Sequence, residues 1–191
     1  MNLETLISSN AVLNAPDIKS KKRALEILAE TLAAGLSASS TKGQAEVSAE
    51  NPAEMNAGYA EYEQSDSDET PESINALEIF ELLTEREKLG STSMGHGVAL
   101  PHARTKLTDT AIAAFLKLDK GIDFDSPDQQ ATDLVFALLV PEHYTDEHLK
   151  ILAYLASLFS DENFCNAIRN VNNSQSIYEN LINWQLTSQA S

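Results

Sequence analysis

The chain has very little cysteine and no long hydrophobic run. One cysteine, Cys165, occurs in 191 residues, so no disulfide can form within the chain, and this composition is compatible with a reducing compartment. No apolar run approaches the roughly 20 residues that a helix needs to cross a bilayer. The N-terminal stretch MNLETLISSN has neither the basic start nor the apolar core of a signal peptide. We therefore expect a cytoplasmic protein with no membrane insertion.

Basic residues are also scarce. The chain has 13 Lys and Arg against 29 Asp and Glu, which gives a formal net charge of −16. Nucleic acids and anionic membranes would repel such a protein, so neither is expected as a partner. A protein partner with a basic or neutral docking face fits this charge better.

Much of the acidic excess lies between residues 36 and 72, where small and polar residues dominate. Aromatic residues there are limited to Tyr59 and Tyr62, and no apolar periodicity survives. Such a segment cannot bury enough surface to offset the entropy of ordering it. We predict a disordered acidic insert inside a single domain of residues 1–185, with a flexible tail at 186–191. A partner-recruiting motif around the two tyrosines is the sharper alternative.

The remaining sequence alternates between helical and strand patterns, which indicates an α/β domain. Helices are predicted at about 20–35, 73–88, from Thr145 onward, 162–169 and 175–185. Strands are predicted at 97–100, 111–118 and 133–140. Gly35 is the expected end of the first helix, and Thr145 is a good N-cap residue. The segment 133–140, DLVFALLV, is continuously apolar, so we expect it near the centre of the sheet.

The most informative run is GSTSMGHGVALPHAR, residues 90–104. Its glycines and small hydroxyl residues allow backbone N–H groups to approach an anion closely. The apolar stretch that follows ends at Pro101 and His102, which places an imidazole at the end of a strand. A histidine beside an anion-binding turn is the minimal arrangement for carrying a phosphoryl group.

Other chemistries are poorly supported by the sequence. The four histidines (His96, His102, His143 and His148) show no metal-binding spacing, and no cofactor is expected. The glycine-rich turn fits neither a P-loop nor GxGxxG, and no nucleophile elbow or Cys–His pair is visible. Cys165 is expected to be a buried structural thiol in an amphipathic helix.

Of the chemistries considered, attack of a histidine on phosphorus remains. An imidazole can attack a phosphoryl group when one ring nitrogen is unprotonated and the other is held by an acceptor. The product needs hydrogen-bond donors, for which Arg86 and His148 are candidates. Each residue also has a purely structural interpretation: a strand-end histidine, a solvated helix arginine and a histidine in the first turn of a helix.

The run EREKLGSTSMGHGVALPHAR resembles the active-site segment of phosphotransferase-system (PTS) IIA components of the fructose–mannitol type, particularly the nitrogen-related branch, enzyme IIA-Ntr. The resemblance extends to residues 1–35 and about 73–185. It implies a PTS EIIA type-2 domain, an α/β fold with a central mixed sheet and helices on both sides. It also implies that His102 is phosphorylated, that Arg86 and His148 bind the phosphate, and that Ser91 and Thr92 contact it. The expected activity is that of a phosphotransferase component with a phosphohistidine intermediate.

The resemblance implies an HPr-like carrier (NPr) as phosphoryl donor. Two functions stay open: a regulator of proteins such as sensor kinases or potassium transport proteins, or a sugar-specific IIA component that passes phosphate to a IIB domain. The chain departs from the family at the acidic insert and at His96, since the family usually has Gly-Asn-Gly there. An imidazole at this position could alter the pKa of His102 or its phosphate contacts.

Overall fold

The computed structural model describes residues 2–15, 17–42 and 71–188, whose strands form one mixed sheet organised around β6 (Thr132–Pro141). β6 pairs antiparallel with β5 (Ile112–Ile122) and parallel with both β3 (Val98–Ala99) and β4 (His102–Thr105). β1 (Val12–Ala15) joins β5 in parallel, and β2 (Ser93–Gly95) joins β3 antiparallel. Leu134 to Val140 are all buried, which confirms the central place predicted for this apolar segment.

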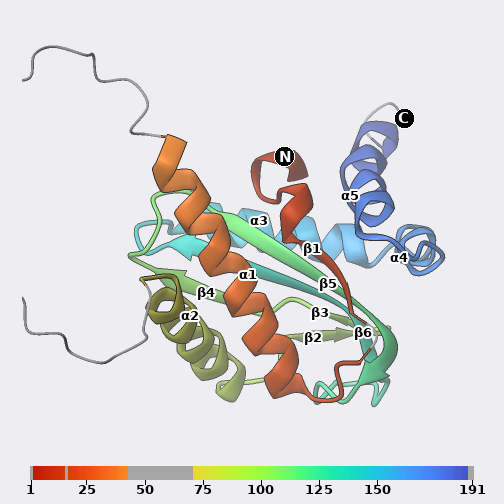
Figure 1. The fold of residues 1–191 in the computed structure, drawn as a ribbon. Helices are drawn as coiled ribbons and strands as arrows, with labels where there is room; N and C mark the ends of the chain where they lie inside the picture. The colour runs from red at the N-terminus through yellow and green to blue at the C-terminus, as the bar shows by residue number, and fades with distance from the viewer. Residues whose placement is uncertain (1, 16, 43–70, 189–191) are drawn as a thin grey trace, which may run out of the picture.

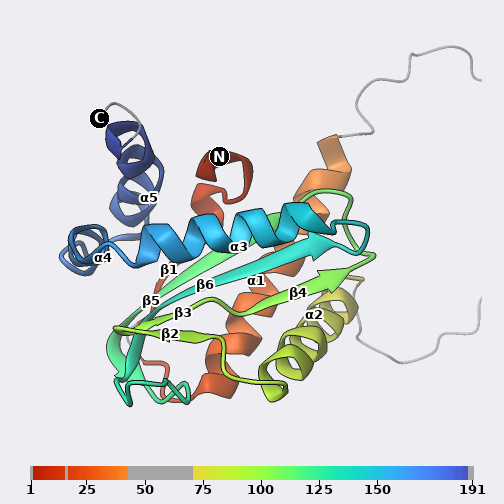
Figure 2. The ribbon, with the colours of Figure 1, turned by 180° about the vertical axis from the view of Figure 1, so that it is seen from behind.

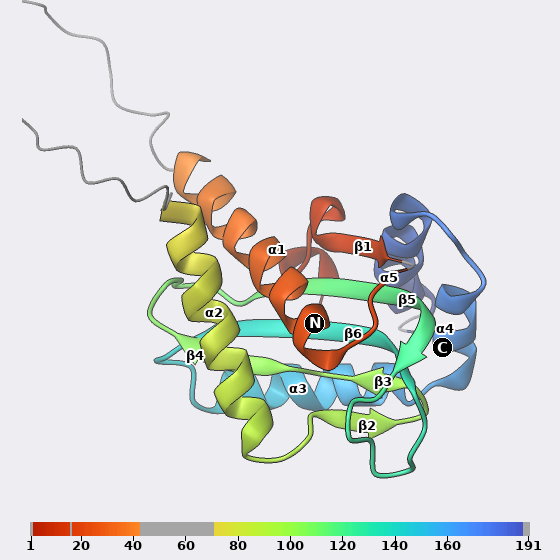
Figure 3. The ribbon, with the colours of Figure 1, turned by 60° about the horizontal axis from the view of Figure 1, so that its bottom comes forward.

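Helices cover both faces of the sheet (Figures 1, 2 and 3). α1 (Lys21–Lys42) and α2 (Pro71–Lys88) lie side by side on one face, and α3 (Asp146–Phe159) crosses the other. α4 (Glu162–Arg169) and α5 (Ser174–Ser188) lie near β1. Two short 3-10 turns, at Leu3–Thr5 and Ser9–Ala11, precede β1 in the chain. This arrangement is the predicted α/β fold with a central mixed sheet.

Aromatic side chains fill the space between the sheet and α3. The rings of Phe115 on β5, Phe136 on β6 and Phe159 on α3 have centroids 5.7–6.3 Å apart. Phe164 extends the cluster to Trp184, with centroids 5.6 Å apart. The first turn of α4 is closed by Asp161, whose side chain accepts from two backbone N–H groups. These contacts fix α3 against the sheet, and α3 carries one predicted site residue, His148.

The prediction that the first helix ends at Gly35 is wrong, because α1 continues to Lys42. A glycine inside a helix costs only about 1 kcal/mol relative to alanine. Leu36, directly after it, is buried in the core and favours continuation of the helix. Residues 36–42 are therefore helical rather than part of the insert. The rest of the predicted insert, residues 43–70, lies outside the described residues.

Smaller differences concern element bounds. α2 begins at Pro71, because proline is well tolerated in the first turn of a helix. α5 runs to Ser188, beyond the predicted start of the tail at 186. Across the described ranges, no helix is both long and apolar enough to cross a membrane.

Candidate functional site

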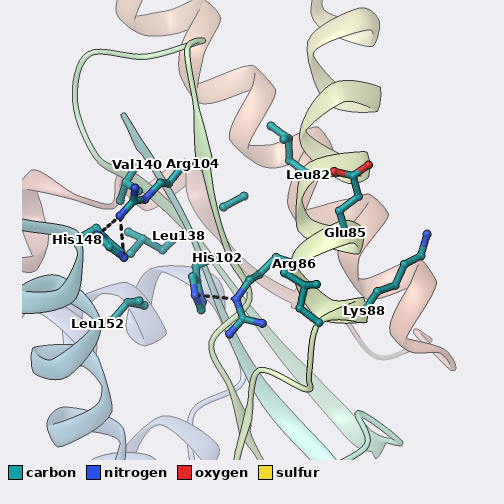
Figure 4. Close-up of a pocket in the computed structure, with 12 residues that line it drawn as sticks. Leu82, Glu85, Arg86, Lys88, His102, Arg104, Leu138, Val140, His148 and Leu152 are labelled. Atoms are coloured by element: carbon teal, nitrogen blue, oxygen red, sulfur yellow. Dashed lines mark hydrogen bonds between the residues drawn. The ribbon is translucent and has the colours of Figure 1, made fainter. Parts of the chain in front are cut away.

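A pocket of about 770 Å³ opens between α2, β4 and the start of α3. Arg86 enters it from α2, His102 and Arg104 from β4, and His148 from α3 (Figure 4). Leu82, Leu138, Val140 and Leu152 supply an apolar wall. The structure thus brings together three of the five predicted site residues, His102, Arg86 and His148.

His102 is held with one ring nitrogen free of a proton. Its Nδ1 lies 2.9 Å from the carbonyl oxygen of Leu100, which can only accept, so the proton is assigned to Nδ1. Arg86 Nε donates to His102 Nε2 across 3.1 Å, which requires a lone pair there. Both contacts therefore select the same tautomer, with Nε2 as the nucleophilic atom.

The surroundings of His102 also keep it neutral. Burial lowers its pKa from the usual 6.5, and the positive charges of Arg86 and His148 lower it further. The hydrogen bond to Leu100 and the carboxylate of Glu87 act in the opposite direction without reversing the shift. At neutral pH the imidazole is uncharged and available as a nucleophile.

Arg86 is positioned by the end of α2 and the turn that follows. Its Nη1 donates to the carbonyl oxygen of Gly90 across 3.0 Å, so one guanidinium ties the turn to His102. The neighbouring Glu87 is buried and forms a 2.9 Å ion pair with Lys21 at the start of α1. Glu87 also accepts from the backbone N–H and hydroxyl of Thr92, at 3.1 and 2.5 Å. This carboxylate fixes the turn on which the position of Arg86 depends.

His148 is paired with an arginine that the sequence analysis did not single out. His148 Nδ1 lies 2.6 Å from Thr145 O, and Arg104 Nη2 lies 2.9 Å from Nδ1 and 3.4 Å from Nε2. Thr145 O and Arg104 Nη2 thus both lie against Nδ1, and together they hold the imidazole of His148 in place. Arg104 follows His102 by two residues on β4, and side chains two apart in a strand share a face. That spacing was the available signal for Arg104.

Thr145 is the N-cap residue of α3, as predicted, but it lacks the capping hydrogen bond. Its backbone angles are helical. Its carbonyl group instead accepts from His148. Thr145 therefore orients the imidazole rather than closing the end of the helix.

Ser91 and Thr92 do not line the pocket. Ser91 Oγ donates to Phe124 O across 2.6 Å, and the Thr92 hydroxyl is bonded to Glu87. Both side chains hold the turn together in this structure. Their predicted contact with phosphate stays a prediction that this geometry does not favour.

The other histidines and the cysteine lie elsewhere. His96 is exposed at the turn between β2 and β3, and His143 stacks edge-on against Tyr144. Cys165 is buried in α4, where burial raises the pKa of its thiol, in keeping with the expected structural role. Within the described ranges no group of three or more His, Cys, Asp or Glu could hold a metal ion.

The arrangement is suited to phosphorus chemistry. A neutral imidazole presents Nε2 to an open pocket, and two guanidinium groups and a second imidazole surround it. Guanidinium groups are the side chains best matched to phosphoryl oxygens, because their donors form a planar fork. The pocket can therefore hold a phosphoryl group against His102 Nε2, the nitrogen that would attack the phosphorus.

The chain is similar to known proteins over most of its described residues. Residues 69–184 match the family "Phosphoenolpyruvate-dependent sugar phosphotransferase system, EIIA 2". Nitrogen regulatory proteins from Bradyrhizobium diazoefficiens and Pseudomonas aeruginosa are 43% identical over 104 residues and 40% identical over 117 residues. These matches cover 54% and 61% of this chain, and 68% and 75% of the relatives. The crystal structure of nitrogen regulatory protein IIA-Ntr from Neisseria meningitidis superposes with a TM-score of 0.68 at 29% identity, covering 92% of this chain and 96% of that one. The chain therefore belongs to the EIIA type-2 family of the phosphotransferase system and is similar to its nitrogen regulatory members.

Proposed function

We propose that His102 Nε2 accepts a phosphoryl group from the phosphohistidine of an HPr-like carrier (NPr), in the cytoplasm. The Nε2 lone pair forms the new N–P bond while the N–P bond of the donor breaks. The donor ring, protonated on its other nitrogen, leaves as neutral imidazole, and His102 becomes a phosphorylated imidazolium. No proton needs to be released, because Nδ1–H of His102 keeps its bond to Leu100 O throughout.

The hydrogen bond from Arg86 Nε to His102 Nε2 is the single observation that carries this proposal. It brings a guanidinium into contact with the unprotonated nitrogen of a half-buried, neutral histidine. When phosphorus approaches Nε2, the same guanidinium can move onto a phosphoryl oxygen with little displacement. Such preorganised donors stabilise the charge that develops in the transition state.

His148 and Arg104 complete the proposed site from the other side of the pocket. Their mutual contact places the guanidinium of Arg104 beside the imidazole of His148, on the neighbouring elements β4 and α3. His148 also lies in the first turn of α3, where the helix dipole favours negative charge. In this proposal Ser91 and Thr92 shape the turn, and the phosphate is bound by side chains alone.

The phosphorylated protein would act as a regulator. A phosphoryl group adds about two negative charges to one surface patch, which a partner can read directly. The similarity to nitrogen regulatory proteins favours this role over sugar transport. Its targets, sensor kinases or potassium transport proteins by family resemblance, would bind one form and not the other. The sugar-specific IIA role is the alternative outcome of the test below.

The test is phosphorylation of the purified protein with phosphoenolpyruvate, an enzyme I-type kinase and the HPr-like carrier. We expect an acid-labile adduct on wild type and on the control variant His143→Ala, whose imidazole is exposed and outside the pocket. His102→Ala should not be labelled. Labelling of His102→Ala at the wild-type level would overturn the assignment.

A second step separates the two roles. The phosphorylated protein is mixed with an isolated IIB domain of the fructose or mannitol type. A regulator should keep its label, whereas rapid transfer to the IIB domain would favour the sugar-specific role.

A further inference from the structure

A second pocket, of about 590 Å³, shares no lining residue with the first. Its lining residues come from β1, β5, β6, α4 and the turn before α5. Its lining is almost entirely polar, consisting of Asn14, Lys117, Asp119, Asp133, Arg169 and Asn172 beside one leucine. A concave site of this size and composition suits a small, strongly polar ligand.

Lys117 is the unusual residue of this pocket. It sits on β5 with only 5% of its surface exposed. Its ammonium group donates to Val171 O and, across 3.2 Å, to Asn172 Oδ1. Among the described residues no carboxylate forms an ion pair with it. Two neutral acceptors satisfy two of its three N–H groups, while the carboxylates of Asp119 and Asp133, which line the same pocket, do not form an ion pair with it.

The other cation of the pocket is already neutralised. Arg169 forms a two-pronged ion pair with Asp133, with N–O distances of 2.8 and 2.7 Å. Its second Nη2 contact is the carbonyl oxygen of His96. Buried lysines are rarely found without a paired charge, because removing an ion from water is costly. Lys117 is thus the group that an anion entering the pocket would neutralise.

Asn14 carries a buried oxygen that lacks a hydrogen-bond donor. Its Nδ2 donates to Asn172 O across 2.8 Å. Its Oδ1 is buried and has no hydrogen-bond donor in the described part of the chain. A buried acceptor without a partner costs free energy, so a ligand that brings a donor is favoured here.

We propose that this pocket binds a small monocarboxylic acid that carries a hydroxyl or ammonium group next to its carboxylate. The carboxylate pairs with Lys117, and a rotation of the Asn14 side chain, which lines the pocket, brings its buried Oδ1 to the donor group. The carboxylates of Asp119 and Asp133 line the same pocket and disfavour a dianion such as phosphate. The site is separate from His102 and does not depend on phosphoryl transfer.

The test is a titration of the full chain followed by backbone amide NMR, with L-lactate, L-alanine and propionate as probes. We expect saturable shifts at residues lining the pocket, with L-lactate or L-alanine binding more tightly than propionate, which lacks the donor. Lys117→Met should weaken binding roughly tenfold to hundredfold, the range for a charge-assisted hydrogen bond. Lys120→Met, an exposed lysine on the same strand, should bind as wild type does.

Asn14→Ala provides a test that leaves Lys117 in place. In this variant the advantage of the donor-bearing acids over propionate should disappear, while propionate affinity is retained. The proposal is overturned if none of the three acids gives saturable shifts in the millimolar range. It is also overturned if Lys117→Met and Lys120→Met, both folded by circular dichroism, bind equally well.

Discussion

Replacing Arg86 with methionine tests the proposed phosphoryl chemistry most directly. Methionine keeps much of the length of the side chain but removes the donor that lies 3.1 Å from His102 Nε2. Losing one preorganised donor to a developing charge typically lowers a rate by about 10² to 10³. We expect a loss in this range rather than complete inactivity, because His148 and Arg104 still line the pocket.

The same substitution changes the titration of His102. The charge of Arg86 contributes to lowering the pKa of His102, so the variant should have a higher pKa, nearer 6.5. A measurement well above that pH keeps His102 neutral in both proteins. The rate difference then reports the lost donor and not a change in the fraction of neutral imidazole. Arg86→Lys retains the charge without the planar fork, so its rate should lie between the two.

The assay is single-turnover transfer from the phosphorylated carrier, stopped in alkali and resolved as phosphorylated and free protein. Arg23→Met is the matched control, because Arg23 is exposed on α1 and pairs with Glu26 away from the pocket. If Arg86→Met accepts phosphate within about threefold of wild type, the transition-state role assigned to Arg86 is incorrect.

Three further predictions follow from the same contacts. The pKa of His102, measured by NMR, should lie below 6.5, so phosphoryl acceptance should stay constant as the pH falls to 6.5. Below that pH the unfolded chain takes up the proton first, so the folded protein should lose stability there; a titration midpoint at or above 6.5 would contradict the burial argument. Glu87→Gln weakens the buried contacts with Lys21 and Thr92 and should lower the free energy of unfolding by about 2 kcal/mol in urea, with Glu81→Gln as the exposed control. Deleting residues 43–70 should leave the free energy of unfolding unchanged or raise it by about 1 kcal/mol, because these residues offer little apolar surface and a shorter loop costs less entropy to close. A clear loss of stability would show that the segment packs against the domain.

The elements with strong periodicity could be predicted from the sequence. The continuously apolar segment that forms β6 is buried, and the amphipathic helices that form α2 and α3 each bury one side, although Leu77 on α2 and Leu149 on α3 are exposed. β4 is different, because its four residues HART show no pattern of their own. It is a strand only because β6 offers an unpaired edge, with His102 opposite Leu138. A tertiary pairing of this kind leaves no local signal.

The site shows the same division. His102, Arg86 and His148 stand in a recognisable motif, and the fold places all three in one pocket. The roles of Ser91 and Thr92 could not be read in this way, since a hydroxyl bonds to whichever acceptor the fold brings near. Here those acceptors are a backbone carbonyl and the carboxylate of Glu87. Arg104 was missed because its partner His148 is distant in sequence.

His96 occupies a backbone conformation that few residues adopt. Its φ of +54° lies in the left-handed region, between Gly95 and Gly97, whose φ angles are also positive. Asparagine and histidine are among the few residues that adopt this region readily, so a histidine is tolerated here. Its backbone N–H donates to Asp128 and its carbonyl accepts from Arg169, while its imidazole is exposed and outside the pocket.

His96→Asn should therefore leave both phosphoryl acceptance and thermal unfolding unchanged. His96→Val should lower the free energy of unfolding by about 1–2 kcal/mol, because a β-branched side chain is strained at positive φ. The measurements are the single-turnover transfer assay and urea unfolding. A reduced transfer rate in His96→Asn with normal stability would show that the imidazole acts on His102 after all. With the expected result, the sequence of the β2–β3 hairpin would be explained by its backbone conformation, and that of the Pro101–His102 end by phosphoryl transfer.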